Sequence, residues 1–361
     1  MTSSCALCRT AGTPGDVALD LGDQPSIRHY PAASDPLPDP TYPLAMWVCP
    51  ACGLAQLVAD DTDGPEVEVP ESAAVADQAR QSVADLVDLL DGRSTVRAFP
   101  SPHGGSGIDA YLARGLSVTT AQADVVVDSF GIMHEPDQAG AFAERASAVA
   151  PGGMLVLTVQ PVGDIVAGRQ WTALRHGHVA YYSLTSLRNA LATVGFVPTR
   201  LRRYALYGGT AVVVATRDGV PDEALTRVYE REAEAGLASP AGFGPLRASV
   251  ETGVEDLRAY LDDHATKGSR LYAYGAPSRA ISLLAAVGSS ARALTAVADA
   301  APAKQGRCLP VSRVPVISPV ELVAADPDEV LLLLDDLYDE VLAAHPTLAG
   351  HLVRLPGGAD A

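Results

Sequence analysis

The segment Leu174–Ser183 concentrates side chains that can take part in acid–base chemistry. It holds His176, His178, Arg175 and Tyr181, in a chain of 361 residues that has only 8 histidines. An imidazole changes its charge near pH 6.5, so a histidine can accept a proton near neutrality. A positioned arginine or tyrosine can stabilise negative charge that develops on a reacting oxygen. This segment is therefore the first candidate for a reactive site.

Four of the 5 cysteines form two pairs that are typical of metal ligands. Cys5 and Cys8 make one CxxC motif, and Cys49 and Cys52 make a second one 40 residues later. Two such turns can complete a tetrahedral Zn²⁺ site, and Gly53 suits the tight turn after the last ligand. Four unrelated thiols or a redox CxxC are the alternatives. A closed four-cysteine site has no open position for a substrate, so we expect structural zinc without catalysis.

The overall composition limits the classes of partner. The net charge is −17 and the isoelectric point is about 4.8, which disfavours binding to a nucleic-acid backbone. No apolar run approaches the roughly 20 residues that span a bilayer, and the N-terminus shows no charged leader or apolar core. We therefore expect a cytoplasmic protein, in which paired cysteines are metal ligands rather than disulfides.

Strands and helices alternate through the middle of the chain. Apolar residues at helical spacing predict a helix over residues 73–90, and continuous apolar runs predict buried parallel strands. The closing segments of this region predict an antiparallel pair. The expected strands are 96–99, 116–120, 124–130, 154–159, 196–203 and 210–216, and the expected helices are 108–114, 138–149 and 184–194.

A second α/β unit follows a linker that is rich in Ala, Glu and Gly. We expect strands at 270–274, 294–299 and 329–334 with helices at 254–265 and 281–287, a small Rossmann-like sheet. The predicted fold class is α/β in three parts: a zinc-binding module (1–65), a truncated class I methyltransferase-like domain (66–217), and linker helices with a Rossmann-like domain (218–361).

Several segments, taken together in their order along the chain, resemble the sugar-nucleotide C-methyltransferase family. The matching pieces include both CxxC motifs, His134-Glu135-Pro136-Asp137, Pro151-Gly152-Gly153, His176-Gly177-His178 with Tyr181-Tyr182-Ser183, Gly208-Gly209-Thr210, Ala273-Tyr274-Gly275-Ala276 and Lys304-Gln305-Gly306. The resemblance implies a three-domain enzyme with a zinc-binding first domain that methylates C-3 of a TDP-linked keto-deoxysugar.

The resemblance also assigns candidate catalytic residues. The family's reaction needs a base that removes a proton alpha to a ketone, and the matching positions are His134 and His178, with His176 beside them. The family's acidic residue has become Gly177, and its leading tyrosine has become Arg175. Arg175 or Tyr181 would stabilise the enolate oxygen. For each histidine, a capping, surface or structural role is the alternative. We expect this segment at the edge of the middle sheet.

The S-adenosylmethionine site departs most from the family. The first strand runs into Pro100-Ser101-Pro102-His103 without an acidic residue, and the second ends in Thr119-Thr120, also without one. Only 28 residues run from Val96 to Ala123, an interval in which the family places a further strand and helix. Binding of S-adenosylmethionine is therefore doubtful, although a divergent working methyltransferase remains an alternative.

The C-terminal unit carries a second candidate binding motif. The family's Gly-Ala-x-x-Lys-Gly turn becomes Gly275-Ala276-Pro277-Ser278-Arg279-Ala280. Free N–H groups at a helix start favour an anion, and Arg279 could hold a diphosphate with its fork of donors. Gly275, Ala276 and Arg279 are thus candidate nucleotide-binding residues, against a purely structural turn.

Three functions remain open from the sequence. The favoured hypothesis is an enzyme of specialised-metabolite or antibiotic biosynthesis that acts on a small molecule such as a TDP-sugar. It would use histidine-based proton transfer without S-adenosylmethionine, for epimerisation, isomerisation, elimination or cyclisation. The alternatives are an S-adenosylmethionine-dependent sugar C-methyltransferase and a non-catalytic scaffold. No nucleic acid or membrane partner is expected.

Overall fold

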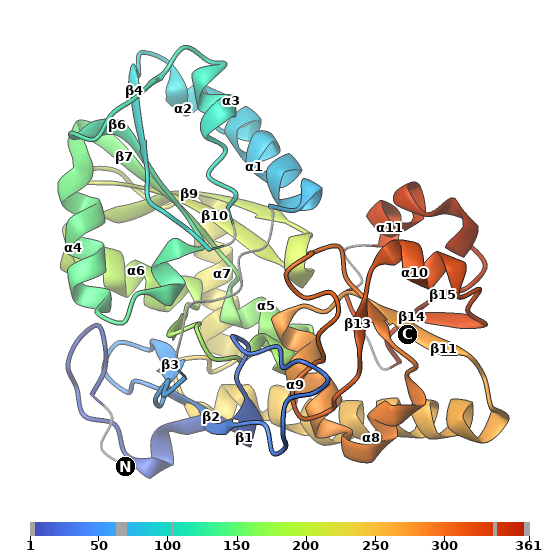
Figure 1. The fold of residues 1–361 in the computed structure, drawn as a ribbon. Helices are drawn as coiled ribbons and strands as arrows, with labels where there is room; N and C mark the ends of the chain where they lie inside the picture. Colours follow the sequence, from blue (N-terminus) through green and yellow to red (C-terminus); the bar gives the residue numbers. More distant parts are fainter. Residues whose placement is uncertain (1–3, 63–70, 103, 335–337, 357–361) are drawn as a thin grey trace.

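The computed structural model describes residues 4–62, 71–102, 104–334 and 338–356, and its strands form three sheets (Figure 1). The mixed α/β class predicted from the sequence is confirmed. His103 and most of the acidic stretch before the first long helix lie outside the described residues. Within the described ranges, each helix is too short or too polar to cross a bilayer.

The N-terminal module contains an antiparallel sheet that recruits a strand from far along the chain. Its order is β1-β2-β3-β8, formed by β1 (Val17–Pro25), β2 (Thr41–Val48), β3 (Ala55–Leu57) and β8 (Ala180–Tyr181). β8 lies in the histidine-containing segment and pairs with β3. The expectation that this segment lies at the edge of the middle sheet is therefore wrong: it completes the sheet of the zinc module.

The middle sheet has the order β5-β4-β6-β7-β10-β9. β4, β5, β6 and β7 are parallel neighbours, and β10 runs antiparallel to both β7 and β9, which confirms the predicted closing pair. Residues 119–122, between β5 and β6, form neither helix nor strand. The bounds are β4 (Thr95–Ala98), β5 (Ser117–Val118), β6 (Ala123–Ser129), β7 (Val149–Val159), β9 (Val197–Tyr204) and β10 (Thr210–Thr216).

Helices cover both faces of the middle sheet because its strands present apolar side chains alternately to the two sides. Val125 and Val127 pack with the helices that precede and follow β4, whereas Val126 packs with those that follow β6. The helix predicted over 73–90 breaks at Leu86. The first group is α1 (Ala73–Asp85), α2 (Val87–Leu90) and α3 (Ile108–Leu112), and the second is α4 (Gln138–Ala148), α6 (Leu184–Thr193) and α7 (Glu223–Glu234). A 3₁₀ turn, η2 (Gly131–His134), and α5 (Val162–Ala167) follow β6 and β7.

The C-terminal unit is a five-stranded parallel sheet with the order β13-β12-β11-β14-β15. This arrangement confirms the Rossmann-like expectation, although β12 is shorter than predicted. The strands are β11 (Leu271–Tyr274), β12 (Val297–Ala298), β13 (Val316–Ile317), β14 (Glu329–Leu332) and β15 (Leu352–Arg354), and the helices are α8 (Gly244–Lys267), α9 (Ser278–Ala286), α10 (Pro319–Ala324) and α11 (Tyr338–Ala344).

The N-terminal module and the C-terminal unit share one hydrophobic core. Leu44 and Met46 of β2 belong to the same buried cluster as Ile281 of α9 and Leu309. Trp171, between α5 and β8, lies in this cluster as well. In Figure 1, the long helix α8 runs along the lower side of the molecule, from the region of β1 to below the C-terminal part. Leu174 and Tyr181 of the segment that carries the candidate histidines also belong to this shared core.

Candidate functional site

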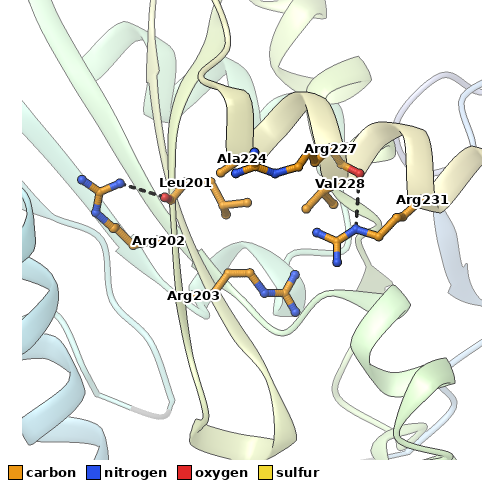
Figure 2. A pocket seen from close by; sticks show the side chains of 7 residues that line it. All are labelled: Leu201, Arg202, Arg203, Ala224, Arg227, Val228 and Arg231. Carbon is orange, nitrogen blue, oxygen red and sulfur yellow. Dashed lines mark hydrogen bonds between the residues drawn. The ribbon is translucent and has the colours of Figure 1, made fainter.

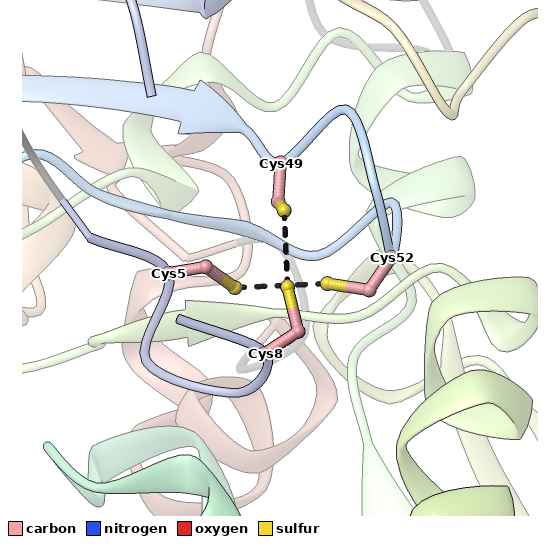
Figure 3. Close-up of side chains that lie close together, drawn as sticks. All are labelled: Cys5, Cys8, Cys49 and Cys52. Atoms are coloured by element: carbon pink, nitrogen blue, oxygen red, sulfur yellow. Dashed lines mark hydrogen bonds between the residues drawn. The ribbon is translucent and has the colours of Figure 1, made fainter. Parts of the chain in front are cut away.

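The four cysteines of the CxxC motifs converge on one point (Figure 3). Their sulfur atoms all lie within 4.8 Å of one another, with Cys5 to Cys52 at 3.6 Å and Cys8 to Cys49 at 3.5 Å. Four sulfurs at about 2.3 Å from a Zn²⁺ would be roughly 3.8 Å apart, so the geometry fits a tetrahedral zinc ion. Gln56 donates a hydrogen bond to the Cys5 sulfur at 3.3 Å, an outer contact that orients a ligand.

The turn η2 places His134, and buried side chains hold its backbone. Asp128, at the end of β6, accepts a hydrogen bond from the Ile132 N–H at 2.9 Å. Gln138, at the start of α4, donates to the carbonyl oxygens of Ile132 at 2.8 Å and Glu135 at 2.7 Å. Because both side chains are buried, these bonds compete little with water. His134 is thus presented by a rigid turn.

Arg145 of α4 connects the same network. Its guanidinium donates to Asp128 at 2.6 Å and to Glu135 at 3.0 Å, and the side chains of both Arg145 and Asp128 are fully buried. Tyr182, directly after β8, donates its hydroxyl hydrogen to Gln138. The turn that carries His134 and the strand that follows His178 are therefore linked through Gln138.

The structure brings His134 and His178 together. Their rings meet edge to face with centroids 4.6 Å apart. The guanidinium of Arg175 contacts the Nε2 atom of His178 and donates to the hydroxyl of Ser278 at the start of α9. His178 is buried and His134 is partly exposed. Two imidazoles and one permanent positive charge thus occupy one corner between the middle sheet and the C-terminal unit.

The surroundings of His134 favour its neutral form. Burial first, and then the positive charge of Arg175, lower the pKa of His134 from the ordinary 6.5 to about 4. A hydrogen bond to the backbone of Gly177 opposes this shift without cancelling it. At neutral pH this imidazole is therefore uncharged, as a proton acceptor requires.

His176 occupies a different environment from the other two histidines. Its side chain is fully buried, its Nε2 atom lies 3.2 Å from the carbonyl oxygen of Pro43, and its ring meets Tyr42 edge on. Burial lowers its pKa. These contacts lie inside the zinc module, which gives His176 a role in anchoring the segment to β2 and does not bring it to the His134–His178 pair.

Asp60 holds the same segment from the zinc module. Its carboxylate accepts a hydrogen bond from the Gly177 N–H at 2.6 Å, and hydrogen bonds to Thr62 and Gly177 lower its pKa despite burial. An acidic group therefore lies beside position 177, although the chain has glycine there. Asp60 was not among the residues predicted from the sequence, because 117 positions separate the two partners and no motif links them.

Tyr181 is committed to the backbone of its own loop. Its hydroxyl accepts from the Arg175 N–H at 3.0 Å and lies 3.2 Å from the Arg175 carbonyl and 3.3 Å from that of Ala173. Its side chain is buried, and burial raises its pKa. Tyr181 shapes the loop that presents Arg175, which leaves Arg175 as the better candidate for contact with a substrate oxygen.

The C-terminal glycine turn is occupied by side chains of this chain. The Ala276 N–H donates to the carboxylate of Asp299 at 2.7 Å, and the Ala276 carbonyl accepts from Lys304 at 2.8 Å and from the hydroxyl of Tyr30 at 3.0 Å. Gly275 has a φ of 90°, which a larger residue would adopt only with strain. Both backbone groups of Ala276 are engaged, and Asp299 lies where an external anion would bind.

Arg279 reaches the middle domain from the second position of α9. Its guanidinium lies over the ring of Tyr207, 5.7 Å from the centroid, and Tyr207 in turn meets Phe130 edge on at 5.9 Å. Phe130 directly precedes the turn that carries His134. Arg279 thus joins Arg175 at the same junction of the middle and C-terminal parts.

The glycine loop after β4 is also in contact with a carboxylate of this chain. The Gly105 N–H donates to Glu71, and a methyl group added at Gly104 would lie 2.5 Å from a Glu71 oxygen. The turn after β6 packs just as closely against this loop: a methyl group added at Gly131 would lie 2.5 Å from the carbonyl oxygen of Pro100. No acidic residue follows β4 or β5 directly. The loop is thus closely packed against Glu71 and the turn that follows β6.

Two models of known protein families match the two ends of the chain. Residues 205–354 match a family model described as "C-methyltransferase C-terminal domain", and residues 8–61 match one described as "Putative zinc binding domain". C-methyltransferase NovU from Streptomyces niveus is 25% identical over 240 residues, which are 66% of this chain and 57% of the relative. The chain thus spans a little over half the length of the curated relative that it matches.

Methyltransferases are among the solved structures that are similar to this chain. Magnesium protoporphyrin IX methyltransferase ChlM from Synechocystis PCC 6803, with bound SAH, is 17% identical, covers 44% of this chain and 90% of its own, and has a TM-score of 0.31. Mitomycin 7-O-methyltransferase MmcR is 15% identical over 39% of this chain and 54% of its own, with a TM-score of 0.32. TM-scores this low carry no argument about the fold, so the α/β class rests on the strand order of the three sheets. On the two domain models and the curated relative, this chain is related to the C-methyltransferases.

Proposed function

We propose that this chain is an enzyme that moves a proton alpha to a carbonyl group of a small molecule without using S-adenosylmethionine. The observation that carries the proposal is the His134–His178 pair, with ring centroids 4.6 Å apart and Arg175 against His178. A non-catalytic scaffold has no evident need for two imidazoles and a cation at one junction. Geometry of this kind is what acid–base catalysis requires.

His134 would act as the base. Its lowered pKa keeps it neutral at physiological pH, so it could accept the proton when the C–H bond breaks. The electron pair of that bond would move into the carbonyl group as an enolate, whose negative oxygen Arg175 would stabilise. Return of a proton to the other face would give epimerisation, and return to another atom would give isomerisation.

Independence from S-adenosylmethionine is supported by the loop after β4. Class I methyltransferases hold this cofactor at a glycine-rich turn and bind its ribose through an acidic residue. Here Glu71 accepts the hydrogen bond of the Gly105 N–H, and no acidic residue directly follows β4 or β5. The strand β5 is only 2 residues long and forms the sheet edge, which would leave a cofactor with little wall to pack against.

We propose a nucleotide-linked keto-deoxysugar as the substrate class, in specialised metabolism. The similarity to C-methyltransferases and the position of Arg279, next in sequence to the Ser278 that Arg175 contacts, support this choice. Because Asp299 engages the Ala276 N–H, recognition of a diphosphate would depend on Arg279 more than on the backbone of the turn.

Deuterium exchange tests the proton transfer directly. The full chain is incubated in heavy water with a TDP-linked 4-keto-6-deoxysugar, and incorporation at the carbons next to the ketone is followed by NMR. We expect exchange with the wild type, a loss of about 100-fold or more in His134→Gln, and no change in His351→Gln, which alters a histidine directly before β15 in the C-terminal unit. Equal background exchange in all three proteins would refute the proposal.

An S-adenosylmethionine-dependent C-methyltransferase is the second candidate, and the relative NovU favours it. Calorimetric titration with S-adenosylmethionine separates the two. Micromolar binding, together with a methylated product from a labelled donor, would establish the second candidate and overturn independence from the cofactor. Absence of binding beside active deuterium exchange would support the first.

A further inference from the structure

A pocket of about 300 Å³ lies between the edge strand β9 and the helix α7, and none of its lining residues belongs to the histidine segment (Figure 2). It is lined by Leu201, Arg202, Arg203, Ala224, Arg227, Val228 and Arg231. Four of these seven residues are arginines, in a chain with 26 basic and 43 acidic residues. The pocket is therefore a local concentration of positive charge on a strongly acidic protein.

The arginines surround an apolar floor. Figure 2 shows Leu201, Ala224 and Val228 between the strand and the helix, with the guanidinium groups of Arg203 and Arg231 near them. Arg227 and Arg231 are four positions apart on α7 and so lie on the same side of the helix. Arg202 extends to the opposite side of β9, as the alternation of a strand requires. Three guanidinium groups thus share one side.

Nearby carboxylates compensate these charges only in part. Arg203 pairs with Asp164, whereas Arg227 pairs with Glu223 in a surface pair of which both members are more than half exposed. Exposed ion pairs of this kind contribute little to stability, so their arginines can readily exchange partners. Among the described residues Arg231 forms no ion pair, and its one hydrogen bond goes from Nε to the Arg227 carbonyl at 3.3 Å. Its terminal nitrogens are available to a ligand.

Asp222, a carboxylate at the start of α7, is already engaged. It caps the helix by accepting from the Leu225 N–H at 2.9 Å, and it accepts from the Leu201 N–H of β9 at 3.1 Å. Its negative charge is therefore directed at the backbone, where it fixes the helix against the strand. Asp222 thus joins α7 to β9, the two elements that line the pocket.

We propose that this pocket binds the phosphoryl or diphosphoryl group of a small molecule. Guanidinium groups bind phosphoryl oxygens through paired hydrogen bonds and are weakly hydrated, so an apolar floor strengthens their effect. Several guanidinium groups suit a ligand with more than one negative charge. The volume is at the lower end of the range of about 300–1,000 Å³ for ligand pockets, which fits a phosphate group better than a complete nucleotide-sugar. The assignment does not depend on the proposed proton transfer.

Binding of inorganic diphosphate and, in parallel, of TDP is measured on the full chain. Each measurement is made at low salt and again at about 0.15 M salt, where charges are screened over a Debye length of about 8 Å. We expect a Kd below about 1 mM for diphosphate, which weakens about tenfold in Arg231→Gln and further in the Arg227→Gln/Arg231→Gln double variant. Arg200→Gln is the matched control, because Arg200 also lies on β9 but pairs with Asp88. None of the three arginines is buried, and unfolding temperatures check that the variants fold.

The two probes distinguish the source of the group. Loss of both diphosphate and TDP binding in Arg231→Gln supports the pocket with a nucleotide as its ligand, and loss of diphosphate binding alone supports it with a free phosphate compound. Absence of diphosphate binding to the wild type overturns the proposal. Equal binding by the double variant and Arg200→Gln overturns it as well.

Discussion

Arg175 offers the most informative single perturbation of this protein, because it affects the charge of His134 without belonging to the same element. We consider Arg175→Met, which removes the charge and keeps much of the side-chain length. Burial and then the positive charge of Arg175 lower the pKa of His134 from 6.5 to about 4. The variant removes the second cause and leaves the first, so the pKa should rise while remaining below the ordinary value.

The size of the expected pKa change follows from the removed charge of Arg175 and the remaining burial of His134. A neighbouring like charge commonly changes a pKa by about one pH unit or more, equivalent to about 1.4 kcal/mol. Because the pKa of His134 is lower in the folded protein than in the unfolded chain, the unfolded chain binds more protons between pH 6.5 and about 4. Stability is therefore lost as the pH falls through this window, by up to about 3 kcal/mol from His134 in the wild type. The loss should be about 1.4 kcal/mol smaller in Arg175→Met.

The assay is an NMR titration of protein with labelled histidine, in which the signal of His134 is assigned from its absence in His134→Gln. Urea unfolding at steps from pH 7 to below pH 4 measures the stability change in parallel, because most of the difference between the two proteins develops below pH 5. Arg200→Met, which removes a surface charge, is the control and should leave the His134 signal unchanged. A wild-type His134 that titrates near 6.5, or one that does not respond to Arg175→Met, would refute the electrostatic reasoning.

Three further predictions concern the rest of the site. Cys49→Ser should abolish bound zinc as measured by elemental analysis, whereas Cys308→Ser, outside the cluster, should retain it; equal zinc content in both would exclude the four-cysteine site. Arg145→Met leaves Asp128 buried without its partner, and we expect the free energy of unfolding to fall by about 3–5 kcal/mol; a loss below about 1 kcal/mol, the size of a surface pair, would contradict the structural role assigned to this pair. Asp60→Ala removes the charged acceptor from the Gly177 N–H and should cost about 1.5–3 kcal/mol in urea unfolding; an unchanged midpoint would show that Asp60 does not hold the histidine segment.

The zinc site and the long strands could be predicted from the sequence because each depends on residues that are close along the chain. A CxxC turn presents two sulfurs whatever surrounds it, and the apolar runs at β6, β7 and β10 have no alternative to burial. The order of motifs also indicated a resemblance to C-methyltransferases, which the two domain models and the curated relative bear out.

The position of the histidine segment could not be predicted in the same way. β8 has 2 residues, too few for any periodicity, and its pairing with β3 places it in the zinc module rather than the middle sheet. Similarly, Asp60 and Gln138 have no motif that marks them, yet one holds Gly177 and the other holds the turn of His134. Their roles arise from contacts across long stretches of chain.

Patterns along the chain were sufficient to identify the ligands of the metal cluster, the α/β class and the candidate residues His134, His178 and Arg175. The folded chain was needed to show that His134 and His178 meet, that His176 does not join them, and that Asp299 engages the C-terminal turn. Local patterns reflect the burial and backbone preferences of neighbouring residues, and so they specify elements and short motifs. A site assembled from distant segments depends on how the whole chain packs its hydrophobic surfaces together.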